Sequence, residues 1–232
     1  MLEGNIFLPG DKSISHRIAL FSVLGRGDVE IENFSPGEDV SYSDTNFQLL
    51  GLIIESITHK PLHIVYEDVI FRPLRLNHTW LVGHSENRHD INTATADVFY
   101  KEKEINMIRS NGAYWADGGI VSTADEMIVF LKALNEGRII KKSTLDLMHK
   151  WHKLHFPLEY GYGTMYFNLP HFIGNWMYLP PLWGHSGSTG SFLYYSEDLD
   201  LYLAGTINQA ESESKPFFAL ISKAIKATKS NK

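Results

Sequence analysis

The chain has 232 residues, of which 21 are lysine or arginine and 27 are aspartate or glutamate, and it contains no cysteine. This length suffices to bury a core without help from a metal or a disulfide. The formal net charge of −6 argues against a nucleic-acid binder, which usually carries a basic patch. The lack of cysteine excludes disulfides, a thiol nucleophile and a Cys-ligated zinc ion, but it is compatible with any redox compartment.

The N-terminal region is predicted to form a strand over 5–9, a helix that ends at Leu24 and a strand over 28–34. Asp11 or Ser13 can cap that helix. The chain does not open with a basic segment followed by an apolar stretch, so we expect no secretory leader. No apolar run is long enough to cross a bilayer, so we expect no membrane span. The chain as it stands is therefore expected in the cytoplasm.

The middle of the chain is predicted to be mainly helical. Thr123 and Glu126 have the spacing of a capping box, and the apolar run behind them ends at Gly137. The other elements expected here are helices over 46–57 and 63–71, a surface loop over 83–96, and a helix that begins at Ser143.

The hydrophobic pattern changes after residue 157, where strand patterns replace helical ones. Strands are expected over 160–167, 190–196 and 199–207, and the polar connector 197–200 makes the last two a hairpin. Apolar residues beside spaced lysines over 215–229 predict an amphipathic terminal helix that packs on the sheet.

Three motifs follow one another in order: Tyr-Ser-Asp at 42–44, Gly-Gly-Ile-Val-Ser-Thr at 118–123 and Gly-His-Ser-Gly at 184–187. This set resembles the penicillin-binding-protein and class C β-lactamase superfamily of serine hydrolases, which includes D-alanyl-D-alanine carboxypeptidases and esterases, over about 34–229. The resemblance implies a β-lactamase/transpeptidase-like α/β (α+β) fold. Such a fold has a mostly antiparallel sheet, flanking helices and a helical subdomain, here at roughly 45–155.

The first 39 residues carry a different signature. The segment Pro-Gly-Asp-Lys-Ser-Ile-Ser-His-Arg at 9–17 resembles the opening motif of 3-phosphoshikimate 1-carboxyvinyltransferase (EPSP synthase). The two resemblances together predict a chimera, with an EPSP-synthase-like strand–helix–strand over 1–38 and a truncated hydrolase domain over 39–232. The two parts are expected to form one compact unit, and the seam is expected within 34–39, which fits both families.

The nucleophile is the part of the hydrolase pattern that the chain lacks. The superfamily uses Ser-x-x-Lys, in which the serine attacks a carbonyl and the lysine manages its proton. The one Ser-x-x-Lys here, Ser212 to Lys215, follows the 184–187 motif and is in the wrong order. Ser13 at a helix start, with His16 three residues later on the same face, is a candidate replacement. Alternatively, Ser13 only caps the helix and His16 is half-exposed.

The resemblance also assigns roles to residues that are present. Tyr42 resembles the general base, although its phenol ionises near neutral pH only beside cations, and it is otherwise a packed aromatic. Asp44 resembles the polar residue that orients the substrate, with helix N-capping as the alternative. His185 resembles a residue of the strand that lines the cleft, with a satisfied edge-strand histidine as the alternative.

Three residues next to His185 complete the expected cleft. They are Ser186, Gly187, where a substrate backbone can approach closely, and Ser188, whose backbone N–H would form half of an oxyanion hole. Candidate walls of the cleft, for which core packing is the default, are Trp115, Tyr160 and Trp183.

The implied function is acyl-enzyme hydrolysis of a small ester, amide or β-lactam, weak or absent because Ser-x-x-Lys is missing. A non-catalytic binding or remnant protein is the alternative. A third hypothesis is a phosphate binder that uses Lys12, Ser13 and Arg17 at a helix start.

The histidines show no metal-binding spacing, so we expect neither a metal nor a cofactor. If the N-terminal fragment does not fill the place of the lost segment, a homodimer could fill it. The ancestral hydrolase, unlike this chain, could have been periplasmic or secreted.

Overall fold

The computed structural model describes residues 43–84, 95–105, 115–177, 179–210 and 217–230. The elements expected before residue 43 lie outside this part. The described helical segments are α2 (Asp44–Thr58), α3 (Leu62–Tyr66), the π-helical turn η1 (Glu67–Phe71), α4 (Arg72–Leu74), α7 (Ala124–Asn135), α8 (Lys142–Met148), α9 (His171–Met177) and α10 (Phe217–Ser230). The described strands are β1 (Trp80–Leu81), β2 (Val98–Tyr100), β3 (Lys103–Ile105), β4 (Ile120–Val121), β5 (His152–His155), β6 (Leu158–Tyr160), β7 (Met165–Phe167), β8 (Leu182–Ser186), β9 (Phe192–Ser196) and β10 (Leu201–Gly205).

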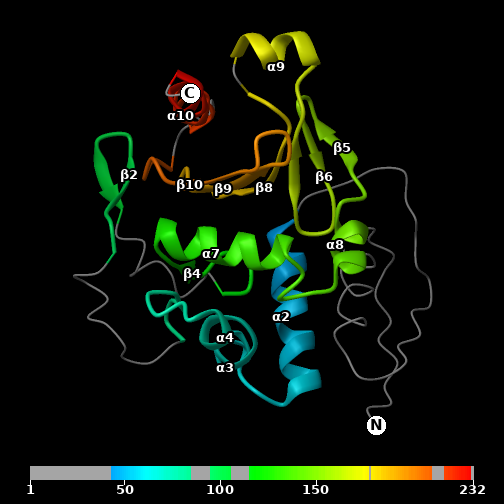
Figure 1. Ribbon diagram of the computed structural model, residues 1–232. Helices are drawn as coiled ribbons and strands as arrows, with labels where there is room; N and C mark the ends of the chain where they lie inside the picture. Colours follow the sequence, from blue (N-terminus) through cyan, green and yellow to red (C-terminus); the bar gives the residue numbers. More distant parts are fainter. Residues whose placement is uncertain (1–42, 85–94, 106–114, 178, 211–216, 231–232) are drawn as a thin grey trace.

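A six-stranded antiparallel sheet in the order β10-β9-β8-β7-β6-β5 forms the centre of the fold (Figure 1). The prediction of a single strand over 160–167 is wrong, because this segment contains parts of two strands. It is the end of β6 and all of β7, which pair with each other across a turn that contains Gly163 at φ +79°. The predicted hairpin of β9 and β10 is confirmed, with Asp200 in the left-handed region at φ 45°. Neither β5 nor α9 was predicted.

Helices cover both faces of this sheet, because its strands place apolar side chains alternately on either side. On one face α10 contributes the buried Ile221 and Ile225 to a cluster with Leu182 and Tyr194. This confirms the predicted terminal helix on the sheet. On the other face Leu131 and Leu134 of α7 and Leu145 of α8 form a second cluster with Trp183 of β8 and Tyr195 of β9. Figure 1 shows α10 and α7 on opposite sides of the strands.

The helix predicted from the capping box is confirmed as α7, and α8 begins one residue earlier than expected. The Thr123 hydroxyl accepts a hydrogen bond from the Glu126 N–H at 3.2 Å, which is one half of the box. The Glu126 carboxylate does not close the other half. It accepts hydrogen bonds from the His78 N–H at 2.9 Å and the Thr79 hydroxyl at 2.6 Å. Glu126 thereby ties α7 to the segment ahead of β1.

The helix predicted over 46–57 is confirmed as α2, but Asp44 is not its N-cap. Ser43 is the N-cap, its side chain makes no capping hydrogen bond, and Asp44 is the first helical residue. The other end of α2 is well tied, because the Glu55 carboxylate accepts a hydrogen bond from the Leu62 N–H at the start of α3. Along its length, Gly51 packs so closely on Trp115 that a Cβ there would lie 2.9 Å from the indole ring.

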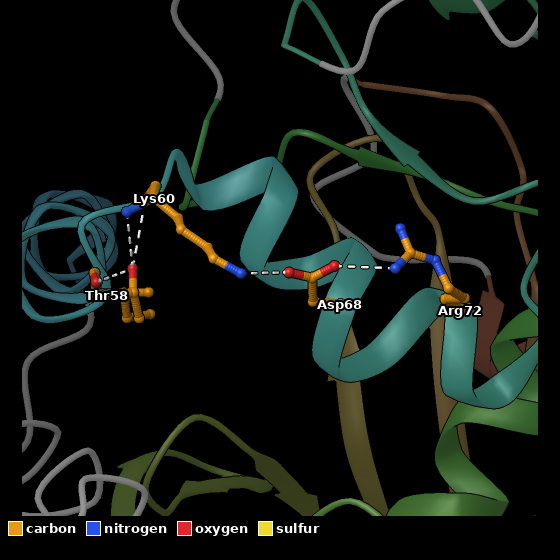
Figure 2. Close-up of polar contacts among 5 residues, drawn as sticks. Thr58, Lys60, Asp68 and Arg72 are labelled. Carbon is orange, nitrogen blue, oxygen red and sulfur yellow. Dashed lines mark hydrogen bonds and ion pairs between the residues drawn. The ribbon is translucent and has the colours of Figure 1, made fainter.

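The helix predicted over 63–71 is a chain of three short pieces, α3, η1 and α4. An exposed ion-pair network joins this region to the end of α2 (Figure 2). The Lys60 ammonium and the Arg72 guanidinium both contact the Asp68 carboxylate, at 2.7 and 3.1 Å. No helix within the described ranges has the length and apolar character needed to cross a membrane.

Candidate active site

The candidate site lies at the C-terminal end of β8, a strand that both cores hold in place. Leu182 and Trp183 point to opposite faces of the sheet and belong to the two clusters. Gly184 packs against the backbone of β9, and a Cβ at this position would collide with the Leu193 carbonyl oxygen. Only glycine therefore fits there, and the path of β8 is fixed.

A tight turn over residues 187–190 follows β8. The Gly190 N–H donates to the Gly187 carbonyl at 3.1 Å, and the Gly187 N–H donates to the Ser191 carbonyl at 2.8 Å. Ser188 lies at the exposed tip. Within the described part of the chain, its backbone N–H has no hydrogen-bond partner. A free N–H on a rigid turn can donate to an oxygen on which negative charge develops.

The segment after β10 holds this turn from the side. The Gln209 N–H donates to the Thr189 carbonyl at 2.9 Å. Gln209 also donates its side-chain Nε2 to the Lys101 carbonyl at 3.1 Å, and the Phe99 N–H donates to the Asn208 carbonyl at 2.8 Å. The β2–β3 hairpin, far away in sequence, thus supports the turn through Gln209. No sequence pattern singled out this glutamine.

Two polar contacts define the orientation of the His185 ring within the described residues. Its Nδ1 lies 2.9 Å from the Ser186 carbonyl oxygen, and its Nε2 lies 3.2 Å from the Tyr160 hydroxyl. Tyr160 comes from β6, with Met165 of β7 and Gly184 of β8 next to it across the sheet. The sequence reasoning treated Tyr160 only as a wall or core residue. It missed the hydroxyl as a partner of His185, because that contact depends on the register of three strands.

The Ser186 side chain points into the sheet. It is 7% exposed, and its hydroxyl donates to the Met165 Sδ at 3.7 Å. Its neighbour Tyr194 is buried as well, and this burial raises the pKa of Tyr194 to about 12. The phenol of Tyr194 therefore stays protonated at neutral pH and cannot serve as a base there.

On the helix side of the predicted cleft, the structure describes Asp44 but not Tyr42. The Asp44 side chain is exposed in the first turn of α2. Asn46, two residues on, is 4% exposed, and its Nδ2 has no hydrogen-bond partner among the described residues. The predicted site residues that lie outside the described ranges are Lys12, Ser13, His16, Arg17, Tyr42, Ser212 and Lys215.

Core packing is the default expectation for the three aromatic wall candidates, and it is confirmed for two of them. Tyr160 and Trp183 are 2% and 3% exposed, so both are core residues. Trp115 is half-buried between Gly51 and the ring of His84, whose centroid is 6.3 Å away. Among the residues with described positions, no three histidine, aspartate or glutamate side chains gather as a metal site would require.

Comparison with known families decides how this arrangement is classified. The model of a family described as Beta-lactamase matches residues 30–225, which is most of the chain. The chain belongs to the beta-lactamase family. The antiparallel sheet with helices on both faces is accordingly a β-lactamase/transpeptidase-like fold, as the three ordered motifs predicted.

Solved structures agree with this membership of the beta-lactamase family. A D-stereospecific amidohydrolase from Streptomyces sp. is 26% identical with a TM-score of 0.62, and the alignment covers 81% of this chain and 56% of that one. The D-amino acid amidase from Ochrobactrum anthropi is 24% identical with a TM-score of 0.67, over 83% of this chain and 59% of that one. The chain thus spans little more than half the length of these hydrolases.

The second predicted resemblance is also found. The 3-phosphoshikimate 1-carboxyvinyltransferase of Desulforudis audaxviator is 46% identical over 54 residues, which is 23% of this chain and 13% of that enzyme. Residues 1–29 precede the beta-lactamase match and are too few to hold 54 residues, so the two matches share sequence. The boundary between residues 38 and 39 stays a prediction.

Proposed function

We propose that this member of the beta-lactamase family binds small esters or amides at the end of β8 and hydrolyses them weakly. The observation that supports this most directly is the N–H of the exposed residue Ser188, which has no hydrogen-bond partner among the described residues and lies on a turn that Gln209 holds in place. The names of the similar structures, an amidohydrolase and an amidase, favour an amide of a D-amino acid as the substrate.

The proposed chemistry is an acyl-enzyme cycle. Ser13 attacks the substrate carbonyl, His16 accepts the serine proton, and the N–H of Ser188 donates to the oxyanion. His16 then returns the proton to the leaving group, and water releases the acyl group by the same route. Tyr42, which resembles the general base of the family, would help to accept the serine proton, and Asp44 would orient the substrate. The missing Ser-x-x-Lys is the reason to expect low turnover.

A fluorophosphonate probe tests the nucleophile. We expect labelling of the wild type, loss of labelling in Ser13→Ala and retention in Ser15→Ala, the matched control two residues on. D-phenylalanine amide, p-nitrophenyl acetate and nitrocefin test turnover. If the wild type neither labels nor turns over any of them, the hydrolase proposal is wrong and the non-catalytic alternative stands.

The oxyanion role of Ser188 has a sharper test, because the turn tolerates proline at this position. Ser188 is the second residue of a turn closed by the Gly190 N–H, a position that proline favours. Ser188→Pro removes the N–H, whereas Ser188→Ala keeps it. We expect Ser188→Pro to lower kcat about 100-fold and Ser188→Ala to change it little. Equal rates in the two variants would remove Ser188 from the mechanism.

A phosphate-binding function is the second candidate, because of the 46% identity to the transferase. Lys12, Ser13 and Arg17 would hold the anion. Shikimate 3-phosphate should then raise the melting temperature of the wild type but not of Arg17→Ala. No shift in the wild type would exclude this function. The proposed homodimer can be checked in the same samples by light scattering.

A further inference from the structure

Tyr160 of β6 and His185 of β8 form a side-chain pair that no sequence motif predicts. The Tyr160 hydroxyl lies 3.2 Å from His185 Nε2. The two rings meet edge to face, with centroids 5.8 Å apart and planes at 86°. Because Tyr160 is only 2% exposed, the core fixes where its hydroxyl lies. The position of the imidazole is therefore set from within the sheet.

The partners of His185 assign its tautomer. Nδ1 lies 2.9 Å from the Ser186 carbonyl oxygen, and a carbonyl can only accept a hydrogen bond. The proton of a neutral ring is therefore on Nδ1. Nε2 then presents a lone pair, and the Tyr160 O–H donates to it. When the ring is protonated, the same hydroxyl oxygen can accept from Nε2–H, so this contact orients the ring in both states.

We propose that Tyr160 is a positioning residue that orients the imidazole of His185, whose Nδ1–H tautomer the Ser186 carbonyl sets, beside the turn over 187–190. This deepens the proposed function, on which it rests, because His185 is one of the side chains assigned to that cleft. Tyr160 itself is buried, so it acts on the substrate only through His185. Any proton that His185 takes up goes to Nε2, the nitrogen that Tyr160 contacts.

Nuclear magnetic resonance of histidine-15N-labelled protein tests this without any turnover. His185→Gln identifies the signals of His185. We expect the wild type to show a protonated Nδ1 and an unprotonated, hydrogen-bonded Nε2. Tyr160→Phe should move the Nε2 resonance downfield, toward that of a nitrogen without a donor. Tyr166→Phe, which removes a phenol oxygen from the adjacent strand β7 and keeps its stacking on Trp151, should leave the resonance in place.

Two outcomes would overturn the proposal: a proton on Nε2 in the wild type, or an unchanged Nε2 resonance in Tyr160→Phe. If Tyr160→Phe does not fold, the wild-type Nε2 resonance decides, because only an unprotonated, hydrogen-bonded Nε2 is consistent with the proposal. Failure of the hydrolase proposal is a separate result, since it appears as absent labelling and turnover while the resonance experiment still gives an answer. Where turnover is measurable, we expect kcat to fall about five- to tenfold in Tyr160→Phe and to be unchanged in Tyr166→Phe.

Discussion

The sheet region and the helical region of this protein differ in how much they contribute to the two buried clusters. Every strand from β6 to β9 contributes a buried side chain to one of two cores. The helices of residues 44–74 contribute no side chain to either of these clusters, and they leave Leu52 and Val69 exposed at 55% and 58%. The strand side of the candidate cleft is therefore rigid, whereas its helix side depends on a few contacts such as Gly51 on Trp115.

The largest expected effect contrasts one glycine in each region. At Gly184 a Cβ meets the backbone of β9, which cannot move without breaking the sheet, so Gly184→Ala should destabilise the fold by about 3 kcal/mol. At Gly51 the obstacles are the Trp115 ring, which can shift, and the Ala116 Cβ, which moves only together with its backbone, so Gly51→Ala should cost about 2 kcal/mol. Urea unfolding followed by tryptophan fluorescence measures both. A smaller loss for Gly184→Ala would contradict the proposed rigidity of β8.

The next effect is a pH dependence confined to the sheet region. His149 stacks on Trp151, with ring centroids 4.8 Å apart, and contacts the tilted ring of Trp183 at 4.5 Å. Burial, helped by the charge of Lys142, lowers the pKa of His149 from 6.5 to about 4. The unfolded chain therefore binds this proton more readily than the folded chain between these two values, and stability falls as the pH drops from 6.5 to about 4.

Because His149 is partly exposed, we expect this loss to be about 1–2 kcal/mol. His149→Phe, which cannot take up the proton, should flatten the decline in urea midpoints over this window. His155→Phe on β5 is an exposed control and should keep it. An undiminished decline in His149→Phe would mean that another group causes it.

A smaller effect compares two helix caps. The Thr123 hydroxyl accepts a hydrogen bond at the start of α7, whereas the Ser43 side chain makes no such bond at the start of α2. Thr123→Ala should therefore cost about 1 kcal/mol and Ser43→Ala only a few tenths of that. Thermal melts of both variants decide this. Equal losses would indicate that Ser43 does cap α2 in solution.

The smallest effect concerns the network in Figure 2. The hydrogen bond from Lys60 holds the pKa of Asp68 below its usual value, with Arg72 adding to this. The lowered folded-state pKa means that any stabilisation is present at neutral pH and is lost as the pH falls through that pKa. Since all three side chains face solvent, Asp68→Asn should leave the urea midpoint almost unchanged at neutral pH, in low and high salt. A clear loss in low salt alone would show that the network matters.

The sequence predicted the parts of this fold that repeat locally. Helical spacing located α2, α7 and α10, because each buries one face and begins or ends at a recognisable residue. The same reasoning merged β6 with β7, since Gly163 reverses the chain where the pattern alone continues as a strand. It also missed α9, which is seven residues long and exposes Phe172 and Trp176 at 75% and 81%.

The candidate site was predictable only as far as motifs reach. The order of the three motifs placed His185 on a strand and Ser188 just beyond it. The contact of His185 with Tyr160, 25 residues earlier, required the register of β6, β7 and β8. The support from Gln209 required the β2–β3 hairpin to lie beside the end of β10. Neither follows from residues that are neighbours in sequence.

The bond between Gln209 and Lys101 joins residues 108 positions apart. Contacts of such long range are the slow ones in folding, because a large loop must close before they form. The sheet can assemble from neighbouring strands, whereas the turn that presents Ser188 acquires its support only when the hairpin docks. We therefore expect the candidate oxyanion site to mature after the core that carries it. A chain caught before that step would have the sheet of this family without an ordered turn over 187–190.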